Sequence, residues 1–376
     1  MAACITGLGA ASPTHAVSQA RSAEMASTVC NHPPRLRRLL PQLYRRSGVQ
    51  HRGSVLLTEA AEPDGNLKQA FFTQATHEER LGPTTEERMK RYEAEVVPLA
   101  ARAAIEALAD AHCAPDHVTH LVTVSCTGFV APGPDIGLIK RLGLPASVQR
   151  THVGFMGCHG AFNALRVAHG LIAADPEAVV LVCAFELCSL HFRYTDDPQQ
   201  IVANALFADG AAAAVCRSAL SNRSNQRAKR NGDDHDAWTL SAFGSHVLPD
   251  TESAMTWRIT DHGFAMTLSP QLPDIIRQHL CARIEPWLAD RGLRVADVAS
   301  WAIHPGGQRI LEAAADALGI DRRHVDDSRI VLAKHGNMSS PTILFILDRL
   351  RRRGAARPAV ALGFGPGLTI EATLFR

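Results

Sequence analysis

The sequence predicts an α/β fold assembled from two related halves, and three observations support this prediction. Short apolar runs rich in Val, Ile and Ala alternate with longer amphipathic stretches along the chain. A spacing of 33 residues recurs between chemically distinctive residues of the two halves. Each half also ends in a glycine-containing turn between runs of small residues, as expected for a duplicated unit.

Four short apolar runs bounded by turn residues predict buried strands. They are residues 119–127, 178–187, 298–305 and 358–367. Two amphipathic stretches, 85–111 and 339–353, predict helices. The polar segment 221–238 predicts a solvated loop. We therefore expect an N-terminal half over residues 1–222 and a C-terminal half over residues 237–376.

The repeat pairs distinctive residues in the same order in each half. In the first half "HLVTVSCT" leads to "GCHGAFNALRVAHGL", and Ser125 precedes Cys158 by 33 positions. In the second half "SWAIHPGG" leads to "GNMSSPTILFILDRL", and His304 precedes Asn337 by the same 33. A duplicated unit is expected to bring equivalent strand ends and helix N-termini to one site.

Composition excludes several classes of protein. The 376 residues are enough for two domain-sized halves with a shared core. A net charge of +2 indicates no general preference for nucleic acid. Hydrophobic residues make up 46% and charged residues 20%, which is typical of a soluble globular protein. No apolar run approaches the ~20 residues of a membrane span, so we expect a cytoplasmic protein without stable membrane insertion.

The nine cysteines are odd in number and scattered, and they include no C-x-x-C pair. This pattern argues against a disulfide framework and against a zinc site, so we expect no metal. Cys158 stands apart because it lies at the start of a predicted helix, where the helix dipole lowers a thiol pKa. It is a candidate nucleophile, with an inert buried cysteine as the alternative.

The two halves together contribute a possible catalytic trio. Cys158 paired with His304 as a thiolate and imidazolium would attack a thioester. The Asn337 amide and an imidazole N–H would donate two hydrogen bonds to an oxyanion. The structural alternatives are a histidine at a strand end for His304 and a helix N-cap for Asn337.

These segments resemble the type III polyketide synthases, the chalcone and stilbene synthase-like branch of the thiolase fold. "MGCHGAFNALR" resembles the nucleophile segment, "IHPGGQRIL" the histidine segment and "HGNMSSPTILFILD" the asparagine segment. The C-terminal signature of the family is similar to "GFGPG", which is Gly363, Phe364, Gly365, Pro366 and Gly367. The resemblance covers nearly the whole chain.

The resemblance implies a homodimeric enzyme with a five-layered αβαβα fold built from two related halves. Such enzymes load an acyl-CoA starter onto the cysteine, decarboxylate malonyl-CoA and extend the chain by Claisen condensation. They use acyl-CoA and malonyl-CoA as substrates and need neither a cofactor nor an acyl carrier protein. A carboxylate at Asn337 would repel the enolate formed by loss of CO2, so an amide suits this position.

The resemblance also assigns substrate-binding positions. Phe207 takes a gatekeeper position between the CoA tunnel and the cavity, and Met266 takes a second one, where the plant enzymes carry phenylalanine. Ala131 takes the position through which the dimer partner reaches the neighbouring site. The remaining cavity positions are Cys126, Cys188, His191, Ala203, Trp257 and Ser339. Trp257 and His191 are bulky enough to close one direction of chain growth.

The basic stretch 35–52 lies where the family binds the anionic end of CoA. Arg46 matches a CoA-contacting lysine position, whereas two neighbouring basic positions fall on Leu39 and Gln42. The residues expected to compensate are Arg38, Arg45 and Arg309. A solvated basic helix face is the alternative interpretation.

Segments 84–100 and 255–276 look more like bacterial alkylpyrone and alkylresorcinol synthases than like plant chalcone synthases. We therefore expect a fatty acyl-CoA starter and an alkylpyrone or alkylresorcinol product. A small or malonyl-only starter and a β-ketoacyl synthase III-like enzyme remain alternatives. A papain-like protease is disfavoured because the C-G-[SA]-C-[WY] sequence is absent. The sequence leaves open the number of condensations and the choice between lactone and aldol closure.

Overall fold

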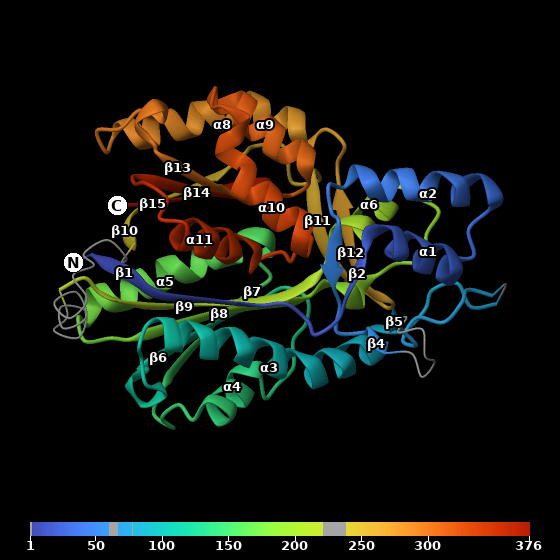
Figure 1. Cartoon of the computed structure of the whole chain (residues 1–376), viewed down its shortest axis with the longest axis horizontal. Helices are drawn as coiled ribbons and strands as arrows, with labels where there is room; N and C mark the ends of the chain where they lie inside the picture. The colour runs from blue at the N-terminus through green and yellow to red at the C-terminus, as the bar shows by residue number, and fades with distance from the viewer. Residues whose placement is uncertain (1, 60–66, 77, 221–237) are drawn as a thin grey trace.

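Helices and strands alternate in five layers in the computed structural model of the chain (Figure 1). The structure describes residues 2–59, 67–76, 78–220 and 238–376. One outer layer consists of α3 and α4, the other of α8 and α9, and the central layer of α5 and α11. Their bounds are α3 (Thr85–Asp110), α4 (Pro134–Leu142), α5 (Gly160–Ala174), α8 (Leu272–Ala289), α9 (Gln308–Leu318) and α11 (Thr342–Arg352).

The two β layers form one hydrogen-bonded sheet in the described part of the chain. Its nine strands follow the order β13-β14-β15-β10-β1-β9-β8-β6-β7. Antiparallel pairing of β1 with β10 joins the halves. The bounds are β1 (Ala3–Ala11), β6 (His120–Ser125), β7 (Gln149–Gly154), β8 (Val180–Leu187), β9 (Asp209–Ser218), β10 (Trp238–Val247), β13 (Ser300–Ile303), β14 (Ala359–Gly365) and β15 (Thr369–Phe375).

Four strands of each half follow the same topology, and β7 adds a fifth strand to the first half in the described part of the chain. In the first half β6 is parallel to β8, and β9 lies antiparallel between β8 and β1. In the second half β13 is parallel to β14, and β15 lies antiparallel between β14 and β10. The predicted α/β fold of two related halves in five layers is therefore confirmed, and the 33-residue spacing runs from β6 to α5 and from β13 to α11.

The predicted strands and helices are confirmed to within a few residues at each end. Helix α3 begins where a capping box predicts a start, because Thr84 Oγ1 accepts from Glu87 N and Glu87 Oε2 accepts from Thr84 N. The predicted loop 221–238 lies almost wholly outside the described residues, and only Trp238, the first residue of β10, is seen. The half boundaries at 222 and 237 stay a prediction.

Apolar side chains pack between the layers and leave the site at one end of them. The central core combines one face of α5 with one face of α11, with Phe162, Leu165, Leu344 and Leu347 all buried. Separate cores lie under α3 and under α8 and α9. Because both sheet faces are covered, strands such as β8 are buried along their whole length.

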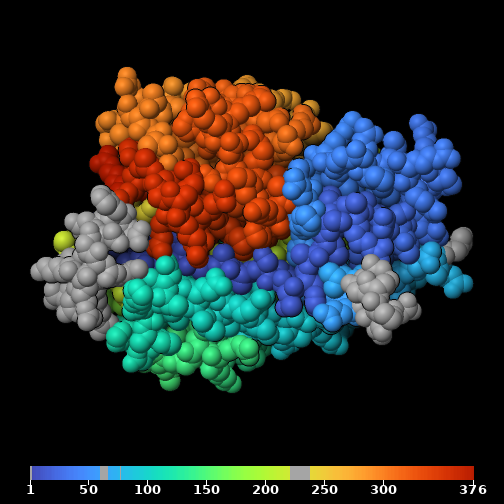
Figure 2. All heavy atoms as spheres, viewed as in Figure 1, coloured from blue at the N-terminus to red at the C-terminus, as the bar shows by residue number. Residues whose placement is uncertain are grey.

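Smaller elements lie beside the layers around the site (Figure 1). Figure 2 shows the segment of α1 and α2, in blue, packed against the orange C-terminal half. The helical elements are α1 (Gln19–Cys30), α2 (Pro34–Arg46), α6 (Pro198–Leu206), α10 (Asp326–His335), η1 (Pro115–His117), η2 (Gly157–His159), η3 (Cys188–His191), η4 (Val295–Asp297) and η5 (Arg322–Val325). The strands are β2 (Ala16–Ser18), β3 (His51–Gly53), β4 (Thr58–Glu59), β5 (Leu67–Lys68), β11 (Met255–Thr260) and β12 (Gly263–Leu268). None of the helices in the described residues is long and apolar enough to cross a membrane.

Candidate active site

Cys158 lies in the single turn η2 that leads directly into α5, as the sequence predicts. The "GFGPG" segment at the end of β14 packs closely against this turn. A Cβ at Gly365 would lie 2.1 Å from His159 Cδ2, and a Cβ at Gly157 would lie 2.7 Å from Pro366 Cδ. Gly157 also has a φ of +68°, which favours glycine. The close approach of these two segments therefore depends on glycine on both sides.

The Cys158 thiol is buried and forms hydrogen bonds with the side chains of Ser339 and Asn337. Burial, opposed by the two hydrogen bonds and aided by the charge of Glu186, raises its pKa to about 11. The lowered pKa expected from the helix dipole is not found, because desolvation of the thiolate outweighs the dipole. In the described state Cys158 is a neutral thiol.

His304 directly follows β13 and is buried. Its backbone N–H donates to Leu362 O at 2.8 Å, which holds the residue at the strand end. Neither ring nitrogen has a hydrogen-bond partner among the described residues. Burial, and to a smaller extent the neighbouring His159, lower the pKa of this imidazole to about 3. His304 is therefore neutral and unpartnered, and the ion pair with Cys158 stays a prediction.

Asn337 is held by its backbone against the end of α6. Its N–H donates to Leu206 O at 3.0 Å, and its carbonyl accepts from Ala208 N at 2.9 Å, so Phe207 lies beside it. Its side-chain Oδ1 accepts from Ser339 N at 2.8 Å, which leaves the amide NH2 group as the donor toward Cys158. Asn337 is not a helix N-cap, because Pro341 takes that position of α11.

Ser339 connects the two halves at the thiol. It has a φ of 56°, a left-handed conformation that is uncommon outside glycine. In this conformation its Oγ lies 3.4 Å from Cys126 Sγ and also bonds to Cys158. The second half thus supplies two hydrogen-bonding side chains, Asn337 and Ser339, to a thiol of the first half.

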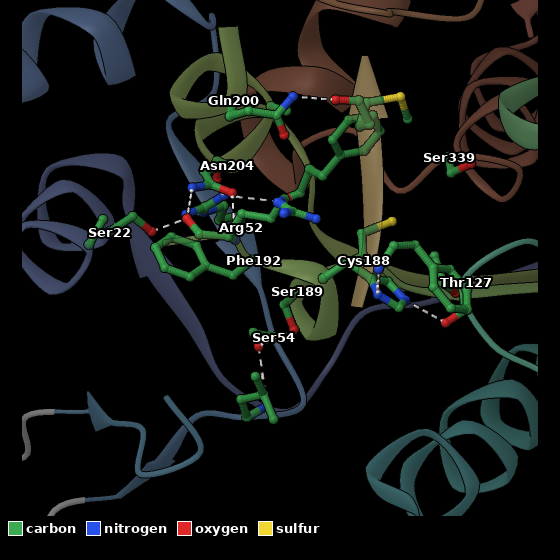
Figure 3. A pocket seen from close by; sticks show the side chains of 18 of the residues that line it. Ser22, Arg52, Ser54, Thr127, Cys188, Ser189, Phe192, Gln200, Asn204 and Ser339 are labelled. Atoms are coloured by element: carbon green, nitrogen blue, oxygen red, sulfur yellow. Dashed lines mark hydrogen bonds between the residues drawn. The ribbon is translucent and has the colours of Figure 1, made fainter. Parts of the chain in front are cut away.

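Cys158 lines a cavity. Figure 3 shows this cavity from close by. Phe207 and Met266, the expected gatekeepers, both line it. So do the expected wall residues Cys126, Cys188, His191, Ala203, Trp257 and Ser339. Ala131 does not line it and is exposed in the described chain. The cavity is apolar where α1 and the segment around Leu56 face it, through Met25, Ala26, Val29, Leu56 and Phe72.

An aromatic group fills one side of the cavity. His191 stacks on Phe264 with ring centroids 4.1 Å apart, and Trp257 packs edge-on against both. Both imidazole nitrogens are used, because Nδ1 accepts from Phe264 N at 3.0 Å and Nε2 donates to Thr127 O at 2.6 Å. Burial lowers the His191 pKa to about 3. Because both ring nitrogens are already hydrogen-bonded, His191 is a wall residue with no nitrogen free to take a proton.

Glu186, which the sequence analysis missed, is a fully buried carboxylate behind the cavity. It accepts from Thr127 Oγ1 and Ser340 Oγ, both at 2.6 Å, and from Cys126 N at 3.0 Å. Burial raises the pKa of this carboxyl, and these hydrogen bonds oppose the shift. Glu186 ties the end of β6 to the segment after Asn337. The sequence contains one signal for this buried carboxylate, because Glu186 is the only acidic residue in the apolar run 178–187.

Arg52, also missed, lines the cavity and holds the gatekeeper segment in place. Its Nη1 donates to Phe207 O at 2.9 Å and to the carbonyl of Asn204, and its Nε donates to Ser22 Oγ at 2.9 Å. Figure 3 shows Arg52, Ser22 and Asn204 together at one side of the cavity. A cation at the carbonyl end of α6 also complements the helix dipole. Arg52 thereby helps to position Phe207.

The expected CoA-binding arginines lie on the surface between α2 and α9. Arg46 ends α2, and Arg309 lies in the first turn of α9. The C-terminal end of α2 and the start of α9 are neighbours. A Cβ at Gly48, two residues after α2, would lie 3.3 Å from Cβ of Gln308, the first residue of α9. Arg38, earlier on α2, is exposed as well. None of these three arginines forms an ion pair within the described residues, and no group of three or more His, Cys, Asp or Glu there is arranged to hold a metal.

Two family models together match nearly all of the chain. The N-terminal domain of chalcone and stilbene synthases matches residues 1–219, and the C-terminal domain matches residues 239–376.

Individual relatives cover the chain at about one third identity. It is 32% identical to the alpha-pyrone synthesis polyketide synthase-like Pks18 of Mycobacterium tuberculosis, over 99% of this chain and 91% of that protein. It is 31% identical to the 1,3,6,8-tetrahydroxynaphthalene synthase of Streptomyces peucetius, over 99% and 92%. The crystal structure of PKS-I from the brown alga Ectocarpus siliculosus has a TM-score of 0.87 and 29% identity, covering 100% of this chain and 98% of that one.

Proposed function

Because the chain belongs to the chalcone and stilbene synthase family and is a type III polyketide synthase, we propose that it extends a fatty acyl-CoA starter with malonyl-CoA. Cys158 carries the growing chain, and the product is an alkylpyrone or alkylresorcinol. The observation that supports the site most directly is a neutral imidazole with no partner for either ring nitrogen, buried in the half that also supplies Asn337 to the Cys158 thiol.

Acyl loading exchanges one thioester for another. Cys158 Sγ bonds to the acyl carbon while the bond from that carbon to the CoA sulfur breaks. His304 takes the thiol proton and returns it to the departing CoA sulfur. An imidazole that no described residue engages is available for this transfer, whereas His191 is fully hydrogen-bonded and is not.

Decarboxylation of malonyl-CoA creates an enolate at the site. The carboxylate leaves as CO2 and its electron pair moves toward the thioester carbonyl oxygen. The Asn337 amide and the N–H of a neutral His304 donate hydrogen bonds to this oxygen. The enolate carbon then attacks the acyl carbon on Cys158 while the bond from that carbon to Cys158 Sγ breaks. The released thiolate takes up a proton, and the extended chain leaves as its CoA thioester.

The walls of the cavity favour a long aliphatic starter. The rings of His191, Trp257 and Phe264 fill one side, so the starter extends along the apolar side formed by α1 and Leu56. Each buried methylene contributes about 0.8 kcal/mol to binding. The likeness to an alpha-pyrone synthesis polyketide synthase-like protein supports this starter class, and the likeness to a tetrahydroxynaphthalene synthase supports the small-starter or malonyl-only alternative.

We also propose that the enzyme is a cytoplasmic homodimer that takes acyl groups from CoA without an acyl carrier protein. The edge strand β7 leaves most of its residues exposed, and the large apolar side chains of Phe129, Phe155 and Met156 are exposed as well. An unpaired strand edge next to exposed apolar groups suits pairing with a second copy. Ala131 lies on the same loop as Phe129. Arg38, Arg46 and Arg309 are proposed to bind the phosphates of CoA.

The decisive experiment is a chain-length series of acyl-CoA starters with radiolabelled malonyl-CoA. We expect kcat/KM to rise by orders of magnitude from short to long chains before it levels off, and peptide mass analysis to find the acyl group on Cys158. Cys188→Phe should shift the preference toward shorter chains while malonyl decarboxylation continues. Faster turnover of acetyl or small aromatic starters than of C10 to C16 chains would overturn the long-chain proposal without affecting the catalytic trio.

A further inference from the structure

Two serine hydroxyls interrupt the apolar part of the cavity wall. Ser54, which follows β3, and Ser189, in η3, both line the cavity, and Figure 3 shows them next to each other. Their oxygens are 2.7 Å apart. Their neighbours in the wall include Leu56 and Cys188, and α1 contributes the apolar residues Met25, Ala26 and Val29 to the same cavity besides Ser22.

The direction of each hydrogen bond in this pair follows from the buried carboxylate behind it. Ser189 Oγ lies 2.6 Å from Asp209 Oδ2 and must donate to it. Ser189 therefore has no proton left for Ser54, so Ser54 Oγ donates to Ser189 Oγ. Asp209 also accepts from Ser189 N at 2.7 Å and from Val55 N at 2.9 Å, which fixes both segments around it.

Only lone pairs remain for a ligand. Each hydroxyl oxygen has two acceptor positions. Ser54 Oγ uses one for Leu56 N at 3.1 Å, and Ser189 Oγ uses one for Ser54. One acceptor position is left on each oxygen, and both protons point along the chain toward Asp209. The pair is therefore a hydrogen-bond acceptor with a carboxylate behind it, and it repels anionic or purely accepting groups.

We infer that this serine pair is a subsite for a hydroxyl group on the starter, and that the enzyme prefers a hydroxylated fatty acyl-CoA to the unsubstituted chain. The inference rests on the proposed function, because it concerns the chain bound along the apolar wall. A hydroxyl donates to the serine pair, whereas an oxo group of nearly the same size has no proton to donate.

The expected preference is moderate. Ser54 and Ser189 already have partners, so a plain chain leaves no hydrogen-bond donor unsatisfied, and discrimination stays well below that of a site that is built only for a substrate hydroxyl. One added hydrogen bond in a desolvated wall predicts roughly a tenfold gain in kcat/KM.

The test compares dodecanoyl-CoA with its positional hydroxy isomers and with the oxo analogue of the best isomer. We expect at least one hydroxy isomer to exceed dodecanoyl-CoA about tenfold in kcat/KM. The oxo analogue of that isomer should have a lower kcat/KM than dodecanoyl-CoA. If dodecanoyl-CoA is consumed and no hydroxy isomer is preferred, this inference is overturned and the proposed function stands. If no fatty acyl-CoA is consumed, both are overturned.

Matched variants separate the serine pair from the rest of the cavity. Ser54→Ala should reduce the preference for the hydroxy isomer, because only the Ser189 oxygen remains to accept, while dodecanoyl-CoA turnover persists. Ser54→Thr, which keeps the hydroxyl, should restore it. Ser189→Ala should have the same effect through the other oxygen. A preference that is undiminished in both alanine variants would contradict the assignment. The comparison of hydroxy and oxo substrates on the unmodified enzyme decides the question even where a variant does not fold.

Discussion

The two halves of the molecule use the same structural position in opposite ways. Ser125 ends β6 in the first half, and His304 follows β13 in the second, each 33 residues before Cys158 or Asn337. Ser125 Oγ accepts from Tyr92 Oη at 2.8 Å and donates to Glu186 Oε2 at 3.3 Å. Neither ring nitrogen of His304 has a partner among the described residues.

Equivalent positions of the duplicated unit thus have different roles: one stabilises the fold, and the other is proposed to serve the reaction. A buried polar group without a partner costs free energy, so Ser125 stabilises the fold and His304 does not. Such a cost persists where the group serves a reaction. At this pair of positions the second half carries the side chain without a hydrogen-bond partner among the described residues, whereas Ser125 of the first half belongs to the Glu186 network.

The helix starts differ in a similar way. Cys158 directly precedes α5 and depends on glycines for its close packing. Asn337 is separated from α11 by four residues and is held by a backbone bridge at Phe207. The backbone bridge holds the main chain of Asn337 when its side chain is replaced, while the Ser339 N–H and the Cys158 thiol each lose a partner.

The largest effect is expected for Asn337→Ala. Removal of one oxyanion donor should lower malonyl-CoA decarboxylation by about 10²- to 10³-fold. Acyl loading on Cys158 should persist, since the backbone bridge to Leu206 and Ala208 is unchanged. The measurements are CO2 release and the mass of the Cys158 peptide. Equal losses in both steps would show that Asn337 acts on the thiol rather than on the enolate.

The second effect concerns the pH dependence of Cys158. With its pKa raised to about 11, only a small thiolate fraction is present at neutral pH, and this fraction grows as the pH rises. The rate of alkylation by iodoacetamide in the resting enzyme should therefore increase roughly tenfold per pH unit between pH 7 and 9. Peptide mass analysis identifies the modified thiol.

A plateau in that rate below pH 8 would contradict this expectation. It would indicate a thiolate held by protonated His304, and His304→Ala should then lower the reactivity near neutral pH. A steady rise that His304→Ala leaves unchanged would assign the resting state to two neutral groups.

The smallest effect is expected on the free energy of unfolding, which tests the comparison between Ser125 and His304. Ser125→Ala should lower the free energy of unfolding by about 1–3 kcal/mol, because the buried Tyr92 hydroxyl and Glu186 each lose a partner. His304→Gln, which keeps a side chain of similar size, should change it by less than about 1 kcal/mol, since no hydrogen bond is lost. Urea unfolding measures both. The opposite ranking would remove the distinction between the two positions.

The sequence predicted the elements that depend on local pattern. Buried strands such as β8 and β14 are continuous apolar runs, and α3 and α11 show helical periodicity, so their positions are correct to within a few residues. The positions of Cys158 and His304 follow from the same reasoning, because a helix start and a strand end are local features. The close packing of His159 against Gly365 was not predictable, since it depends on two segments about two hundred residues apart.

By itself the sequence determined the α/β class, the duplicated unit and the identities of Cys158, His304 and Asn337, because periodicity and spacing are written along the chain. Only the tertiary structure decided the directions of the pKa shifts, upward for Cys158 and downward for His304, since desolvation depends on what surrounds a group after folding. It also decided the pairing of Ser54 with Ser189, which lie 135 residues apart. Hydrogen bonds between distant segments arise from packing, and no local pattern records them.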